Sequence, residues 1–364
     1  MIPLVHVDRD HPGRRRYALT DTTSDHVWGV CAEVEGLFRE PRRETYELFG
    51  WVPESLEVRG WAGSRVWLVP ADRSLEPWLL EDVENIGRHP GTDSLLLTGL
   101  DDYMGPPEGH RASVRVHDGT KWLGSCREFA RVLPPRRTAT PLVLRGLAPS
   151  ARLQRALAKG TRRALELEEA RLEIHDDRGE RLTERVLWPR IRAWRPSSHG
   201  TQLIDLELDA DLAPVPGHAA PVWERWFTGP PGSLGAWTVL GTRQRHVWLE
   251  LVRERDVTFE DRGGRSGRTY LLDGLHITDE PGLHLALGEA VNGPGGYFGG
   301  CLDALVDCLC GRFGYAAPGT LLWQNSATAR EHLSHTLAHD GEPFDLFATV
   351  LDILVAGGMG VTLL

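Results

Sequence analysis

Two parts of the first two hundred residues carry the same short strings in the same order, and this repetition constrains the fold more than any other feature. The string Gly-x-Cys-x-Glu-apolar begins at Gly29 and again at Gly124. The string Leu-x-Gly-x-x-Pro follows each of them, with its glycine 21 residues after Gly29 and 22 residues after Gly124. Two further matches keep this order: Tyr17–Asp21 with Val114–Asp118, and Gly91-Thr92 with Gly200-Thr201. We therefore expect two related modules, near residues 14–103 and 111–210.

Both modules are predicted to be mainly β. Polar and apolar residues alternate along Val114–Val116 and Ile204–Leu208, which is the pattern of a half-buried strand. Turn residues such as Asp118-Gly119 separate these stretches. The second module also carries a helix pattern near residues 150–169, for which Ser150 can serve as the N-cap. The expected fold class of this region is a pair of duplicated, mainly-β (α+β) modules.

A connection rich in proline and glycine, residues 211–267, follows the second module. Within it, Trp237–Leu240 and His246–Val252 are apolar stretches on either side of Gly241–Arg245, and we predict a β-hairpin there. Asp261–Gly267 is rich in glycine and charged residues, as flexible linkers are. We expect a separate C-terminal domain at residues 268–364.

Acidic residues are unevenly distributed along the chain. The 364 residues have a formal net charge of −10, which excludes a general nucleic-acid binder held by phosphate contacts. Residues 268–364 contain three basic and eleven acidic residues, a net charge of −8. Most of the excess negative charge therefore lies in the last quarter of the chain, and we expect this quarter to meet a basic partner.

Composition indicates an ordinary folded protein in a reducing compartment. Hydrophobic residues make up 41% of the chain and charged residues 25%, which excludes wholesale disorder. The apolar stretch near the C-terminus is interrupted by Asp345 and Asp352, so no transmembrane helix is expected. The first residues do not follow the pattern of a secretory signal. Five cysteines without a CxxC pair indicate free thiols, and we expect a cytoplasmic protein.

The last quarter of the chain is predicted to be a small α/β domain. Strand patterns lie at Thr269–Leu272, Leu321–Trp323 and Val361–Leu364, and helix patterns lie at Gly282–Val291, near residues 301–311 and at Phe344–Ala356. Three short strands separated by helices indicate a three-stranded parallel sheet covered by helices.

The helix near residues 301–311 has an unusual charged side. Asp303 and Asp307 lie four residues apart, so a helix places both carboxylates on one side, away from its leucines. Like charges at this spacing repel each other by a few tenths of a kcal/mol. A helix that keeps both can be presenting them to a cation. The alternative is that Asp303 interacts with the helix dipole and Asp307 is merely solvated.

Several strings in this quarter occur in the order of a known family: Leu271–Gly274, Leu283-His284, Tyr297–Gly299, Leu302–Leu309, Trp323 and Gly358–Leu364. The most specific of them is Leu-Asp-Ala-Leu-x-Asp-Cys-Leu after an aromatic-aromatic-Gly loop. Together they resemble the barstar family, the intracellular inhibitors of barnase-type ribonucleases. The resemblance covers residues 268–364 and does not reach the N-terminal modules.

The resemblance implies a set of partner-binding residues. In the family, an aromatic loop and an acidic helix close the active site of the ribonuclease. This implies contacts for the loop residues Tyr297, Phe298 and Gly299, with Tyr297 packing against the enzyme. It also implies contacts for Asp303 and Asp307, with Asp307 taking the place of a substrate phosphate among basic groups.

Two positions depart from the family. Val306 stands where the family has a contact tryptophan. Ile353 falls where the family has a contact glutamate, with Asp352 beside it. We count Val306 and Asp352 among the expected partner-binding residues. The departures imply that the partner is a diverged ribonuclease or a different basic protein.

The leading hypothesis is an intracellular, immunity-type inhibitor of a basic, barnase-like ribonuclease. It requires no catalysis, cofactor, membrane or direct contact with nucleic acid. The alternative is a non-catalytic scaffold or regulator whose duplicated modules bind the main partner. An enzyme in the N-terminal modules is the third hypothesis, and it lacks a recognisable catalytic constellation.

Two other groups of residues are weaker candidates. His332, His335 and His339 would share one helix face and could hold a metal, but a solvated helix is the favoured interpretation. A thiol beside a carboxylate recurs at Cys31-x-Glu33 and at Cys126-x-Glu128. Because no repeated histidine accompanies either pair, the favoured interpretation is a buried core cysteine.

Overall fold

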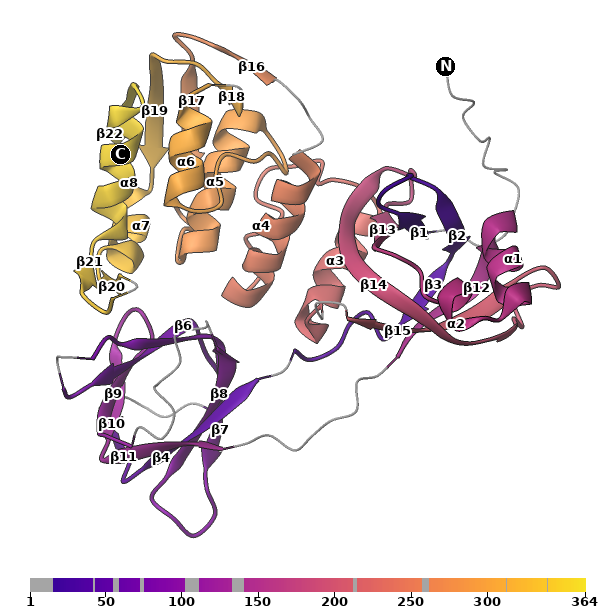
Figure 1. The fold of residues 1–364 in the computed structure, drawn as a ribbon. Coiled ribbons are helices and arrows are strands. Elements are labelled where there is room, and N and C mark those ends of the chain that lie inside the picture. The colour runs from indigo at the N-terminus through magenta and orange to yellow at the C-terminus, as the bar shows by residue number, and fades with distance from the viewer. Residues whose placement is uncertain are drawn as a thin grey trace. The chain divides into compact units, whose positions relative to one another are not determined.

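The computed structural model describes residues 16–41, 43–54, 59–72, 75–101, 111–132, 141–211, 215–256, 262–311, 313–338 and 340–364. The chain forms two compact units (Figure 1). The first contains residues 1–40 and 138–230, and the second contains residues 41–137 and 231–364. None of the helices in the described ranges is both long and apolar enough to span a membrane.

The first unit is built on a closed antiparallel barrel. Its strands are β1 (Tyr17–Asp21), β2 (Val27–Cys31), β3 (Glu33–Glu35), β12 (Leu142–Pro149), β13 (Ala170–His175), β14 (Arg181–Pro196) and β15 (Ile204–Asp211). The ring closes because β15 pairs with both β14 and β12. Buried leucines from β1, β12, β13 and β15 fill its interior, as the alternation along these strands predicts.

Short helices complete the first unit: α1 (Ala151–Lys159), α2 (Arg162–Leu165), the 3₁₀ turn η1 (Gly217–Ala219) and α3 (Ala220–Phe227). Ser150 caps α1, because its side chain accepts a hydrogen bond from the backbone N–H of Leu153. Gly160 has a left-handed φ of 61° and ends α1. The single helix predicted near residues 150–169 is therefore two helices.

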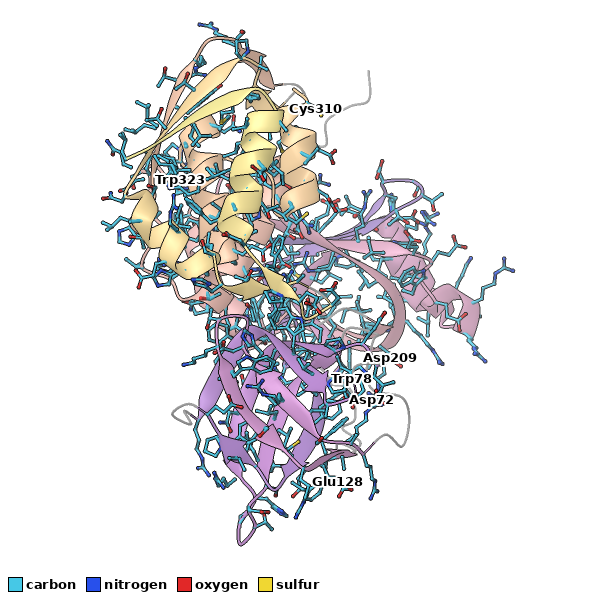
Figure 2. All side chains as sticks on the ribbon, turned by 90° about the vertical axis from the view of Figure 1, so that its left-hand side faces the viewer. Asp72, Trp78, Glu128, Asp209, Cys310 and Trp323 are labelled. Atoms are coloured by element: carbon cyan, nitrogen blue, oxygen red, sulfur yellow. The ribbon has the colours of Figure 1, made fainter. Side chains whose placement is uncertain are left out.

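The second unit contains another antiparallel barrel. Its strands are β4 (Glu44–Phe49), β5 (Val52–Pro53), β6 (Gly60–Pro70), β7 (Trp78–Arg88), β8 (Leu95–Asp101), β9 (Val114–His117), β10 (Trp122–Cys126) and β11 (Glu128–Val132). Its core includes Tyr46, Trp78 and Phe129 (Figure 2). Most of the tryptophans are buried.

The strand pairings of the two barrels correspond one to one. In the first barrel, β1 pairs with β2 and β13, β12 pairs with β2, β3 and β15, and β14 pairs with β13 and β15. In the second barrel, β9 pairs with β10 and β6, the β4–β5 segment pairs with β10, β11 and β8, and β7 pairs with β6 and β8. All of these pairings are antiparallel. Each barrel combines strands from both predicted modules, so the compact units do not follow the boundaries 14–103 and 111–210.

The repeated strings occupy matching places in the two barrels. Gly29 lies opposite Pro149, and Gly124 lies opposite Pro53. The glycines of the second string, Gly50 and Gly146, have left-handed φ angles of 63° and 60°. The aspartates that end β1 and follow β9 form the same turn. Asp21 Oδ1 accepts hydrogen bonds from the N–H groups two and three residues later, and so does Asp118 Oδ1.

The C-terminal region folds as the predicted α/β domain. Its elements are β16 (Arg262–Arg265), β17 (Thr269–Asp273), α5 (Glu280–Asn292), α6 (Leu302–Leu309), β18 (Phe313–Tyr315), β19 (Gly319–Gln324), α7 (Ser326–Leu333), β20 (Thr336–Leu337), β21 (Pro343–Phe344), α8 (Leu346–Ala356) and β22 (Met359–Leu363). Strands β17, β19 and β22 form a parallel sheet in that order, which confirms the prediction. Trp323 on the central strand is fully buried against Phe347 of α8 (Figure 2).

The predicted hairpin in the connection is wrong. Residues Thr242–Asp256 form helix α4, which packs on α5. Arg245, Trp248, Leu249 and Val252 are buried at helical spacing, so the apolar run has a period of 3.6 rather than 2. The expected flexible linker also differs, because Arg262–Arg265 forms β16 and pairs with β18. Residue 261 lies outside the described residues.

Candidate functional site

Helix α6 presents the two predicted aspartates to solvent. Leu305, Cys308 and Leu309 are buried on its inner side, whereas Asp303 and Asp307 are exposed on its outer side. Val306 lies on the exposed side too, with 46% of its surface accessible. Cys301 and Cys310 flank the helix and are exposed. Cys310 is labelled in Figure 2. The amphipathic pattern predicted for this helix is confirmed.

Neither aspartate is neutralised by a described neighbour. Within the described ranges, Asp303 and Asp307 have no ion pair and no side-chain hydrogen bond. Asp303 lies in the first turn of α6, where a negative charge interacts favourably with the helix dipole. Asp307 lies one turn later and lacks this compensation. The helix therefore keeps a pair of repelling carboxylates that are available to a cationic group.

The aromatic loop between α5 and α6 is packed into the domain. Tyr297 is 8% exposed and Phe298 is fully buried, and their rings lie against Phe313 and Tyr315 at centroid distances of 6.3 and 6.0 Å. The side-chain amide of Asn292 donates hydrogen bonds to the carbonyls of Tyr297 and Phe313 at 2.7 and 2.9 Å. The loop is therefore a rigid part of the core rather than a projecting finger.

Gly299 joins this loop to α6. Its φ of +86° lies in the left-handed region, and a Cβ added there would lie 2.8 Å from the backbone N and Cα of Leu305. Only glycine permits this close approach. The sequence prediction placed Gly299 in the partner-binding set, and the geometry gives it a role in positioning α6.

Helix α8 supplies a second exposed edge beside α6. The two helices pack together, and a Cβ on Gly357 after α8 would lie 2.8 Å from Leu309 Cβ. Asp352 is exposed and Ile353 is half-buried. Val355 has 61% of its surface accessible. The apolar side chains Val306 and Val355 therefore accompany the aspartates on the two neighbouring helices.

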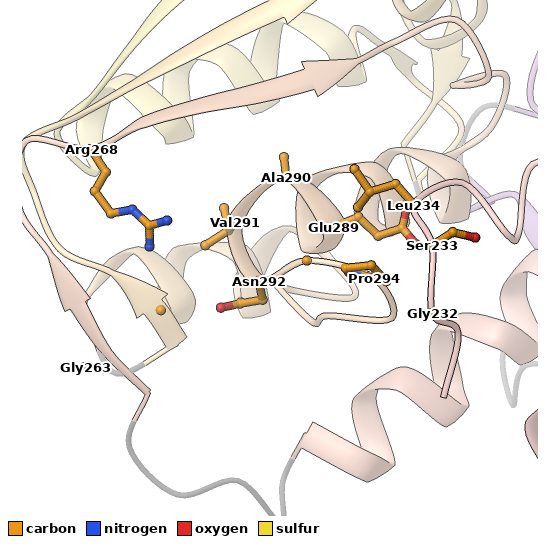
Figure 3. A pocket seen from close by; sticks show the side chains of 12 residues that line it. Gly232, Ser233, Leu234, Gly263, Arg268, Glu289, Ala290, Val291, Asn292 and Pro294 are labelled. Carbon is orange, nitrogen blue, oxygen red and sulfur yellow. The ribbon is translucent and has the colours of Figure 1, made fainter. Parts of the chain in front are cut away.

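Glu289 is a buried carboxylate that sequence reasoning missed. It accepts hydrogen bonds from Gly235 N–H at 2.7 Å and from Trp237 Nε1 at 3.1 Å. Burial raises the pKa of this carboxyl group above its usual value. Glu289 also borders an open hollow between Gly232–Leu234 and the C-terminal end of α5 (Figure 3). The hydrogen bonds tie the segment before α4 to α5.

The alternative histidine site does not assemble in the described part of the domain. His332 is exposed, and its Nδ1 lies 3.0 Å from the carbonyl of Thr328. Helix α7 ends at Leu333, so His335 lies beyond the helix. His339 lies outside the described residues. Across the described ranges, no group of three or more histidine, cysteine or acidic side chains could hold a metal ion.

The repeated cysteines are core residues. Cys31 is 1% exposed and Cys126 is 4% exposed. Burial raises the pKa of the Cys31 thiol to about 12 and that of the Cys126 thiol to about 11. Both thiols are therefore protonated at neutral pH, which argues against their use as nucleophiles.

Comparison with known proteins agrees with the geometry of the C-terminal domain. No curated protein matches the chain. Residues 268–352, which include the aromatic loop, α6 and most of α8, match the family model described as barstar (barnase inhibitor).

Proposed function

We propose that the protein is an intracellular, immunity-type inhibitor of a basic, barnase-like ribonuclease and that it acts from the cytoplasm. The observation that carries the proposal is the outer face of α6. Asp303, Val306 and Asp307 are exposed there on a helix that is anchored from below by buried leucines. The family match to residues 268–352 supports the same kind of partner. The protein itself performs no chemistry in this role.

The chemistry of α6 suits a basic enzyme cleft. A carboxylate on a rigid helix can accept two hydrogen bonds from one arginine, which is stronger and more specific than a single bond. Asp307 is the principal contact in the proposal, and Asp303 and Asp352 are supporting ones. The net charge of −8 on residues 268–364 also steers a cationic partner towards this domain and raises the association rate.

The apolar residues divide into two groups in this proposal. Val306 contributes an exposed apolar contact in the middle of the acidic face. Phe298 and Gly299 act indirectly, because their packing holds the N-terminal end of α6 in place. Tyr297 contacts the partner only if its buried ring becomes accessible.

The proposal is tested by titrating the full-length protein against a panel of barnase-type ribonucleases and measuring residual RNA cleavage. The test variant is Asp307→Asn, and the matched control is Glu331→Gln on the exposed side of α7. Both changes remove one negative charge, so a general charge effect weakens both equally. Inhibition that is lost in the first variant and kept in the second supports the proposal. Equal inhibition by all three proteins contradicts it.

We further propose that residues 14–103 and 111–210 are two copies of one seven-strand module, with β4–β5 counted as one strand, and that the copies exchange their first three strands. The support is the one-to-one correspondence of strand pairings. The strands β1 to β3 of the first module complete the barrel formed by β12 to β15 of the second. Likewise, β9 to β11 of the second module complete the barrel formed by β4 to β8 of the first.

Two barrels with the same pairings favour a second candidate function, a scaffold or regulator with bivalent recognition. In this role the barrels bind the main partner and the barstar-like domain is an adaptor. The discriminating experiment captures partners with the full-length Asp307→Arg variant. Retention of the main cellular partner by this variant supports the scaffold, whereas loss of that partner supports the inhibitor.

A further inference from the structure

The aromatic loop is covered by a segment that lies outside the family match. We call residues 231–256, which contain α4, the α4 segment. Leu249 of α4 is buried, and a Cβ built on Gly300 would lie 4.0 Å from its Cδ2. The same Cβ would lie 3.6 Å from the Cε2 and hydroxyl oxygen of Tyr297. Leu249 and Tyr297 therefore both lie on the Cβ side of Gly300, which joins the loop to α6.

A buried arginine holds the start of α4 to the start of α5. The guanidinium of Arg245 donates hydrogen bonds from Nη1 to the carbonyl of His276, to Thr278 Oγ1 and to Asp279 Oδ2, at 3.0–3.2 Å. The hydroxyl of Thr242 donates to the same Asp279 oxygen at 2.7 Å. Asp279 also caps α5 through the N–H of Gly282. This cluster is the first anchor of the α4 segment.

The second anchor is Glu289, near the other end of α5. Its carboxylate accepts hydrogen bonds from Gly235 N–H and from the indole N–H of Trp237 in the α4 segment, and lies 3.4 Å from Gly295 N–H in the glycine-rich loop. Figure 3 shows Glu289 beside Gly232–Leu234 and Pro294. The α4 segment is therefore attached to both ends of α5. Leu249 of this segment lies near Gly300, just before α6.

We propose that the α4 segment is an autoinhibitory cover of the aromatic loop. This inference rests on the proposed function and describes its regulation. In the closed state, α6 alone meets the ribonuclease. When α4 lifts, Tyr297 becomes exposed beside Asp303 and Asp307, and the contact surface extends from the helix to the loop. The apparent affinity then rises with the fraction of molecules in which the cover is open, because the open state offers the larger contact surface.

Arg245 and Asp307 have different roles in the closed and open states. Arg245 stabilises only the closed state in this proposal, because the partners that it binds outside the α4 segment lie on the loop before α5 and not on α6. Asp307 serves binding in both states, because it is exposed while the cover is closed. A change at Arg245 therefore shifts the equilibrium, whereas a change at Asp307 alters the contact itself. This difference separates the regulation from the function.

The test compares full-length wild type with Arg245→Met, which keeps the apolar length of the side chain and removes its hydrogen bonds. The control is Arg253→Met, because Arg253 is exposed on the same helix. The measurements are the dissociation constant for the ribonuclease that the wild type inhibits and hydrogen exchange of the amides in residues 293–301. If the cover is closed in nine tenths of the molecules, Arg245→Met binds more tightly by up to about tenfold and exchanges faster in the loop. The control leaves both quantities unchanged.

Two further variants distinguish opening of the cover from a simple folding defect. Trp237→Phe removes one hydrogen bond to Glu289 and keeps the ring, and it should raise the affinity in the same direction by a smaller factor. Tyr297→Ala in the Arg245→Met background should cancel the gain in affinity. Faster loop exchange with unchanged or weaker binding overturns the cover. Unchanged loop exchange overturns it as well. If no ribonuclease binds any of the proteins, the proposed function fails and the cover falls with it.

Discussion

The aromatic loop and helix α6 are consecutive in the chain and belong to one expected contact surface, yet the structure treats them differently. Tyr297 and Phe298 are packed under neighbouring elements, whereas Asp303, Val306 and Asp307 are exposed. The strings that resemble the family set the fold of both parts. In the proposed cover, α4, which lies before the matched residues, decides whether Tyr297 is accessible. A family motif therefore specifies where a side chain is placed and leaves its accessibility to the rest of the chain.

The largest expected effect comes from removing the fully buried aromatic side chain of the loop. Phe298→Ala is expected to lower the free energy of unfolding by about 3–5 kcal/mol, because it leaves a cavity in a fully packed site. Val306→Ala, on the exposed side of α6, should change it by less than about 0.5 kcal/mol. Urea denaturation of the full chain measures both. Equal effects would mean that the loop is not part of the core.

Reversing one charge on α6 should have little effect on stability and a large effect on ribonuclease binding, the opposite of Phe298→Ala. Asp307→Arg is expected to leave stability nearly unchanged and to weaken ribonuclease binding by about 2–5 kcal/mol, because a basic partner group then faces a like charge. Glu331→Arg makes the same charge change on α7 and should weaken binding only slightly. Isothermal titration and thermal unfolding of both variants measure the two effects. A large loss of stability in Asp307→Arg would assign this residue to the fold.

Gly299 joins the aromatic loop to α6, and a substitution there should have an intermediate effect on the free energy of unfolding. Gly299→Ala is expected to cost about 1–3 kcal/mol of stability, because alanine disfavours the left-handed φ and its Cβ would press on the backbone of Leu305. Gly300→Ala is the matched control, because its φ is ordinary and its Cβ meets neighbours at 3.6 Å or more. Similar costs for both changes would contradict the assigned role of Gly299.

Local patterns predicted the C-terminal domain well, because its elements are defined by residues close in sequence. The leucine spacing of α6, the Asp-Gly turn after β17 and the glycines after α8 each act over one or two helical turns. The string of α6 is also specific enough to indicate a family. The exposed positions of Asp303 and Asp307 therefore follow from the sequence alone.

The barrels could not be predicted in the same way, because their pairings join distant segments. Tyr17 lies opposite Ile174, and Gly124 lies opposite Pro53. The repeated strings indicated that the strands correspond, but nothing local indicates which partner each strand takes. The surroundings of the aromatic loop were missed for the same reason, because the segment of Leu249, which lies near Gly300, was predicted to be a hairpin. A short apolar run of this kind can be a fully buried strand or part of a buried helix, and the sequence does not distinguish the two until the packing partner is known.

The smallest expected effect concerns pH and compares two groups on α5. His284 is fully buried, and in the described structure neither ring nitrogen has a hydrogen-bond partner. Burial lowers the pKa of His284, so the folded state binds the proton less readily than the unfolded state does. Stability is therefore complete above the unfolded pKa of about 6.5 and falls below it, by at most about 1.4 kcal/mol per pH unit. Glu289 has a raised pKa and contributes the opposite trend, with stability lost as pH rises through its folded pKa.

A pair of variants isolates the histidine from Glu289 and from the other carboxyl groups. His284→Leu should remove the part of the acid destabilisation below about pH 6.5 that is due to this residue, because leucine binds no proton in either state. His332→Leu, at an exposed position on α7, should keep the wild-type profile. Chemical denaturation across this range measures the difference between the two variants, in which the contribution of Glu289 cancels. If stability depends on pH in the same way in both variants, water or a rearranged neighbour solvates His284. Helix α5 would then be less tightly packed between α4 and the sheet than the aromatic loop beside it.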